Sequence, residues 1–131
     1  NGRANITKNY WRENMNKDSL ELTKKICGLL SERKAEDIMY LDISELTVVA
    51  ESFVIASGRS AVQVKAACDF LEEKLNAEGV RPARIDGYNE GRWIVLDYSN
   101  VIVHIFKDED RVFYHLERLW SNGKNMFLYQ E

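Results

Sequence analysis

The sequence predicts an α/β fold, in which a mixed β-sheet is flanked by helices. Apolar residues recur at helical spacing over residues 18–33 and 61–78, and these segments alternate with short runs rich in β-branched and aromatic residues. The 131 residues are enough for a single domain with its own core, and 45% of them are hydrophobic. No apolar run approaches the ~20 residues of a membrane span, so we expect a soluble, cytoplasmic protein.

The N-terminal part of the domain combines one helix with strand-forming segments. A helix is expected over residues 18–33, with Asp18 followed by Glu21 as a capping box. Residues 37–43 and 48–57 are short, apolar and rich in strand formers, and they predict two strands or one interrupted strand.

The segment SGRS, residues 57–60, predicts a turn from a strand into a second helix. Ser60 is expected to cap that helix, with Gln63 closing the capping box, and Gly79 is expected to end it. A brief strand follows over residues 83–87. The order strand, helix, strand predicts a right-handed crossover onto a parallel neighbour.

The run WIVLDYSNVIVHIF, residues 93–106, predicts a β-hairpin that turns at Ser99 and Asn100. This register pairs Ile94 with Ile105, Leu96 with Val103 and Tyr98 with Val101, so that these six residues share a face that we expect to be core. The opposite face is a mixture of aromatic, aliphatic and ionisable side chains: Trp93, Val95, Asp97, Ile102, His104 and Phe106.

A last helix is predicted after Lys107, with Asp108 as its cap. Its apolar stripe is formed by Phe113, Leu116, Leu119 and Trp120, with His115 at the edge and Glu117 and Arg118 pointing outward. Arg111 and Tyr114 would extend the mixed face of the hairpin.

The cysteines and histidines of the chain do not form a metal-binding or redox motif. Cys27 and Cys68 are 41 residues apart in helical segments and are expected to be buried thiols. His104 and His115 are 11 residues apart on different elements, so we expect no metal site. Asp97 and His104 are close to diagonal across the hairpin, which allows either acid–base chemistry or a simple hydrogen bond that satisfies the imidazole.

The turn at residues 57–60 also has the geometry of an anion site, because a glycine-containing turn leads into a helix N-terminus. A nucleotide-binding or nucleotidyltransferase-type enzyme that used this turn would also need a pair of carboxylates for Mg²⁺. The Asp-x-Asp at residues 108–110 is interpreted as a helix start, and Asp69 stands alone after the turn. A helix cap is therefore the favoured interpretation of the turn, and an enzyme is the alternative.

The mixed face of the hairpin has the composition of a protein interface, in which aromatic anchors are ringed by polar groups. The competing interpretation is that the protein's own helices cover these rings in a three-layer fold. A net charge of −3 disfavours sequence-specific nucleic-acid binding and favours a basic protein partner. The predicted partner-binding residues are Trp93, Val95, Asp97, His104, Phe106, Arg111 and Tyr114.

The two ends of the chain are expected to lie outside the domain. Residues 1–14 have no usable periodicity and Met15 is a natural start, so we interpret them as a vector-derived or disordered leader. The domain is then expected over residues 15–121, with a tail over residues 122–131.

Three segments together resemble the ribosomal silencing factor family, the RsfS or Iojap-like proteins. They are ESFVIASGRSAVQVKAACDFLEEKL, GRWIVLDYSNVIVHIF and DRVFYHLERLW, and the resemblance covers residues 18–121. It implies a nucleotidyltransferase-like fold without a catalytic centre or cofactor. The family binds ribosomal protein L fourteen on the large ribosomal subunit, blocks subunit joining and represses translation, and its members are often homodimers.

The same resemblance implies a location for the contact with the ribosomal protein. Residues 93–97 correspond to the family segment that makes this contact, and the hairpin register independently turns Trp93, Val95 and Asp97 outward. At Ser99 the family commonly has glycine.

Overall fold

The computed structural model describes residues 15–130, with the backbone alone for residues 112–114. The prediction of residues 1–14 as a leader lies outside the described part. The elements, in chain order, are α2 (Lys17–Glu32), β1 (Glu36–Asp42), β2 (Ser52–Gly58), α3 (Ala61–Ala77), β3 (Arg84–Asp86), β4 (Trp93–Asp97), β5 (Val101–Lys107), α4 (Asp108–Tyr114), α5 (Leu116–Trp120) and β6 (Met126–Leu128).

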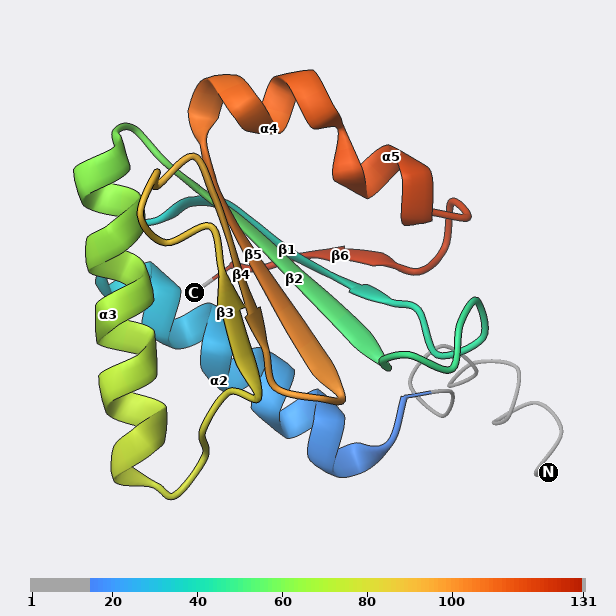
Figure 1. Cartoon of the computed structure of the whole chain (residues 1–131). Coiled ribbons are helices and arrows are strands. Elements are labelled where there is room, and N and C mark those ends of the chain that lie inside the picture. The colour runs from blue at the N-terminus through green and yellow to red at the C-terminus, as the bar shows by residue number, and fades with distance from the viewer. Residues whose placement is uncertain (1–14, 131) are drawn as a thin grey trace, which may run out of the picture.

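The strands form one six-stranded sheet in the order β3-β4-β5-β2-β1-β6 (Figure 1). The β2–β5 pair is parallel and the other pairs are antiparallel, which confirms the predicted mixed α/β sheet. Our prediction that β3 is the parallel neighbour of β2 was wrong. The short β3, which has no fully buried residue, lies at the edge beside β4, and the longer, more apolar β5 is the parallel neighbour of β2.

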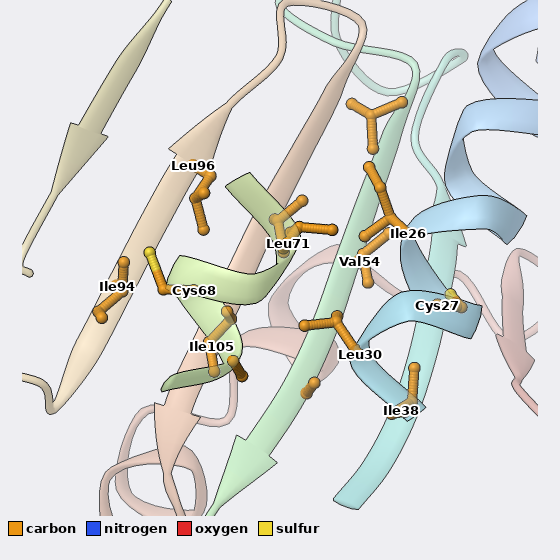
Figure 2. Packing of buried hydrophobic residues seen from close by; sticks show 14 of the residues in the cluster. Ile26, Cys27, Leu30, Ile38, Val54, Cys68, Leu71, Ile94, Leu96 and Ile105 are labelled. Atoms are coloured by element: carbon orange, nitrogen blue, oxygen red, sulfur yellow. The ribbon is translucent and has the colours of Figure 1, made fainter. Parts of the chain in front are cut away.

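Helices α2 and α3 pack on one face of the sheet, and α4 and α5 lie across the other (Figure 1). The larger core lies under α2 and α3. There, Ile26 and Leu30 of α2 and Leu71 of α3 meet Leu96 and Ile105 of the hairpin, all of them fully buried (Figure 2). The predicted inner face of the hairpin is therefore confirmed as core.

A smaller core lies on the opposite face. Leu116 packs there with Phe53, Ile55 and Phe106, and Trp93 is packed against its margin. This second cluster covers part of the face that the sequence left open to either a partner or the protein's own helices.

The N-terminal helix caps agree with the sequence in one case and differ in two, and Gly79, with φ 81°, follows the end of α3 as predicted. Ser60 caps α3, its Oγ accepting from the Gln63 N–H at 3.2 Å, as predicted. The cap of α2 is Asn16 rather than Asp18, because the side-chain Oδ1 of Asn16 accepts a hydrogen bond of 2.7 Å from the Asp18 N–H. In α4 the capping position is Lys107, and Asp108 is the first helical residue.

The predicted last helix is broken in two at His115, which adopts a left-handed conformation with φ 48° and ψ 45°. Leu116 enters the second core, whereas Leu119 is 75% exposed and does not belong to a buried stripe. Glu117, predicted to point outward, instead faces Arg111, with Oε2 at 3.7 Å from Nε.

Residues 122–131, expected to form a tail, contribute a strand to the sheet. Met126, Phe127 and Leu128 of β6 pair with β1 in antiparallel register, and Phe127 stacks on Tyr40 with ring centroids 4.9 Å apart. The segment has no alternating apolar pattern of its own, so its place in the sheet depends on the unpaired edge of β1. None of the described helices is long and apolar enough to cross a membrane.

Candidate docking surface

An open stretch of sheet lies beside α4 and α5, on the face opposite α2 and α3. The register of β3 on β4 and of β4 on β5 places the outward side chains of the three strands together. We define the docking face as the exposed or half-buried members of this set: Arg84, Asp86, Trp93, Val95, Asp97 and Ile102.

The structure brings the predicted hairpin residues onto one face but at different depths. Trp93, Val95 and Asp97 are half-buried and reach the surface. His104 lies on the same face but is only 6% exposed, and Phe106 is completely buried. These two residues lie beneath the docking face rather than on it.

His104 is held within a cage of aromatic rings. Its Nδ1 accepts a hydrogen bond of 3.1 Å from the indole N–H of Trp93, and the edge of Phe53 contacts it with ring centroids 4.7 Å apart. The Nε2 atom is buried and has no hydrogen-bond partner among residues 15–130 as described. Burial lowers the pKa of His104 to about 4, so the imidazole is neutral at physiological pH.

Asp97 does not pair with His104, so the suggested acid–base pair is not formed. Its carboxylate accepts from the backbone N–H of Ser99 at 2.8 Å. Ser99 has φ 72°, and the Asn100 N–H donates to the Tyr98 carbonyl at 3.0 Å, which closes a three-residue turn inside the hairpin. Asp97 thus supports the turn while its charge stays half-exposed.

Arg111 is a buried link between elements and is only 7% exposed. Its Nη1 donates to the Asp37 carbonyl at 2.6 Å and to Ser57 Oγ at 2.9 Å, which ties α4 to the neighbouring ends of β1 and β2. Sequence reasoning had placed this residue on the contact surface. The side chain of Tyr114, also predicted to bind a partner, lies outside the described part.

The polar groups of the turn at residues 57–60 are engaged within the protein. Ser57 accepts from Arg111, Ser60 caps α3, and the Arg59 N–H donates to Gln63 Oε1 at 2.8 Å. A cavity of about 400 Å³ lies beside Ser57, and its wall holds four acids together with Arg111 and His115: Glu36, Asp37, Asp108 and Glu117. The contacts of Ser60 and Gln63 are those of a helix cap, the favoured interpretation of the turn.

The two cysteines are buried in the core, where a structural role is expected. Cys27 and Cys68 are buried as predicted, and burial raises the pKa of each thiol to about 12, which suppresses the reactive thiolate. In the described part of the chain no three His, Cys, Asp or Glu side chains are grouped so as to hold a metal ion.

Sequence reasoning missed part of the docking face. Arg84 and Asp86 join it because β3 pairs with β4, and they form an ion pair of 3.2 Å. Half-buried Trp120 borders the face from α5, its ring 5.2 Å from that of Phe53. The strand pattern had already indicated Ile102, whereas the positions of the other residues depend on contacts between distant elements.

An α/β sheet with an open, aromatic and ionisable face defines a class of domain that offers a surface for binding. The family model described as "Ribosomal silencing factor during starvation" matches residues 16–130. The chain therefore belongs to the ribosomal silencing factor family, as the sequence motifs indicated.

The chain is also similar to individual members of this family. The chain is 31% identical over 108 residues to "Ribosomal silencing factor RsfS" of Halalkalibacterium halodurans, covering 82% of this chain and 92% of that protein. It is 33% identical over 107 residues to the protein of the same name in Bacillus subtilis, covering 82% and 88% of the two chains. A crystal structure of a Chromobacterium violaceum protein is similar with a TM-score of 0.74 and 32% identity, covering 84% of this chain and 92% of that one.

Proposed function

We propose that this protein binds the large ribosomal subunit through ribosomal protein L fourteen and sterically blocks joining of the small subunit, which represses translation in the cytoplasm. Membership of the ribosomal silencing factor family carries the proposal. The relatives' name supplies the ribosome as the target, and the family resemblance supplies the particular ribosomal protein.

The docking face supports this assignment through its chemistry. Trp93 and Val95 offer apolar area at the centre, and Ile102 lies on the neighbouring strand. Asp97 adds a half-exposed carboxylate, Asp86 is already paired with Arg84, and the chain carries a net charge of −3. Such a surface complements a partner that carries basic side chains around an apolar patch, because opposite charges steer association and buried apolar area stabilises the complex.

The mechanism requires no reaction. A domain seated at the face of the large subunit where the small subunit joins would occupy the volume that the small subunit must enter. No nucleotide or metal is required for such exclusion.

Sedimentation of separated subunits with the protein tests the proposal. We expect the protein to co-sediment with the large subunit alone and to reduce the fraction of joined ribosomes. Isolated ribosomal protein L fourteen should bind in a pull-down. Absence of binding to the large subunit would overturn the proposal, and binding that survives removal of ribosomal protein L fourteen would overturn its choice of partner.

A matched pair of variants locates the contact. Val95→Asp places a charge at the apolar centre of the docking face, whereas Val62→Asp places the same group on α3, where Val62 is 76% exposed on the other side of the sheet. We expect Val95→Asp to lose the block of subunit joining and Val62→Asp to keep it. The reverse result would move the contact to the helical side.

Homodimer formation is a further part of the proposal, because members of the family are often homodimers. Sedimentation equilibrium over a range of concentrations measures it directly. A single species of monomer mass at all concentrations would contradict it without affecting the proposed binding to the ribosome.

A further inference from the structure

The indole of Trp93 is held from two sides before any partner arrives. It stacks on Phe106 with ring centroids 4.8 Å apart, and its N–H donates to His104 Nδ1 at 3.1 Å. Phe106 and His104 are both buried, so the half-buried indole rests on fixed groups beneath the docking face.

The hydrogen bond from Trp93 defines the tautomer of His104. Because Nδ1 accepts the indole proton, a neutral imidazole must carry its own proton on Nε2. That nitrogen is buried, and the described residues provide no acceptor for it. A buried N–H without a partner destabilises the folded state, and an apolar side chain at this position would avoid the penalty. His104 therefore provides an acceptor for Trp93 at a cost to folding.

We propose that His104 is a positioning residue that fixes the indole of Trp93 in the orientation required for docking. This inference rests on the proposed function and deepens it. Holding an aromatic anchor in its bound orientation reduces the ordering entropy that binding must overcome. His104 acts through Trp93, since its own exposed fraction of 6% leaves little surface for a partner.

Three single substitutions and one double-mutant cycle test this role. His104→Leu removes the acceptor and fills most of the space, whereas His104→Asn returns an acceptor to the position of Nδ1. Trp93→Phe keeps an aromatic ring but removes the N–H donor. The readouts are the ¹⁵N–¹H resonance of the Trp93 indole, identified by its loss in Trp93→Phe, together with affinity for the large subunit and thermal midpoint.

We expect His104→Leu to shift the indole resonance and to weaken binding about five-fold, the scale of one net hydrogen bond. The thermal midpoint should change little, because removal of the unpartnered imidazole N–H is offset by loss of the acceptor for the indole N–H. His104→Asn should restore most of the affinity. In the Trp93→Phe background, His104→Leu should change the affinity by less than about two-fold.

Two results would overturn the inference. An unchanged indole resonance in His104→Leu would show that His104 does not hold the indole. An equal loss of affinity in the Trp93→Phe background would show that His104 acts by another route. If His104→Leu does not fold, His104→Phe, which keeps an aromatic ring without an acceptor, replaces it in the same cycle.

Failure of the proposed function gives a different pattern. In that case the wild-type protein does not bind the large subunit, although the indole resonance still shifts in His104→Leu. Positioning for docking on the large subunit is then rejected together with the proposed function, and the shift shows that the hydrogen bond itself exists.

Discussion

The indole of Trp93 stacks on the ring of Phe106, with centroids 4.8 Å apart and ring planes inclined by 25°. Phe106 is completely buried in the second core, whereas Trp93 is half-buried on the docking face. The stacked pair therefore spans the boundary between core and surface, so that the proposed aromatic anchor is supported directly by packed side chains.

Trp93→Ala should mainly weaken binding. Truncation removes the aromatic anchor, and we expect a loss of about 2 kcal/mol or more in the free energy of binding to the large subunit. The protein should still fold, because part of the indole is already in contact with solvent. Affinity and thermal midpoint are measured beside Val62→Ala, a truncation at a 76% exposed position on α3, which should change neither.

Leu96→Ala should mainly weaken folding. Leu96 is completely buried in the larger core, three residues after Trp93 on the same strand and on the opposite face of the sheet. The cavity should lower the free energy of unfolding by about 2 to 5 kcal/mol, as measured by urea denaturation. If Trp93→Ala destabilises the fold as much as Leu96→Ala does, Trp93 belongs to the core and the contact surface must be sought elsewhere.

Asp97→Asn should weaken the electrostatic attraction to the partner without disturbing the hairpin turn. The asparagine keeps an oxygen that accepts from the Ser99 N–H, so the turn should survive with little change in thermal midpoint. Loss of the negative charge should slow association with a basic partner and flatten its salt dependence. Association rates are measured at several salt concentrations, and a salt dependence equal to that of the wild type would remove Asp97 from the electrostatic contact.

Ser99→Gly should stabilise the hairpin. Ser99 has φ 72°, a conformation that is costly for residues with a Cβ atom and accessible to glycine. The gain is partly offset by the larger entropy of glycine in the unfolded chain, so we expect about 0.5 to 1 kcal/mol in the free energy of unfolding. Chemical denaturation checks the sign, and Asn100→Gly, at a neighbouring position without a positive φ, is the control that should not stabilise.

Acidification should destabilise the protein through His104. Burial lowers its pKa from 6.5 to about 4 in the folded state, so between these values the unfolded chain binds a proton that the folded chain does not. The free energy of unfolding should fall as the pH drops through this window, by on the order of 3 kcal/mol in total.

The contribution of His104 is isolated by comparison with His104→Asn, which does not titrate there. Asp42, whose pKa is raised by burial, contributes with the opposite sign in both proteins and cancels in the difference. Equal pH dependence of the two proteins would show that His104 is not buried in its neutral form.

The sequence by itself determined the features that depend on local periodicity and local hydrogen bonds. Alternation along residues 93–106 was enough to assign the inner face of the hairpin, because successive side chains of a strand point to opposite sides. The cap at Ser60 also follows from neighbours within three residues. Trp93, Val95 and Asp97 were placed on the outward face for the same reason.

Only the tertiary structure decided how far each outward residue lies from solvent. The break at His115 directs Leu116 toward the sheet, and the resulting second core buries Phe106, while Arg111 is drawn into contacts with Asp37 and Ser57. The addition of β6 to β1 likewise joins residues about 85 positions apart. Such burial and pairing depend on which distant segments come together, and the alternation of a single strand carries no information about what covers its face.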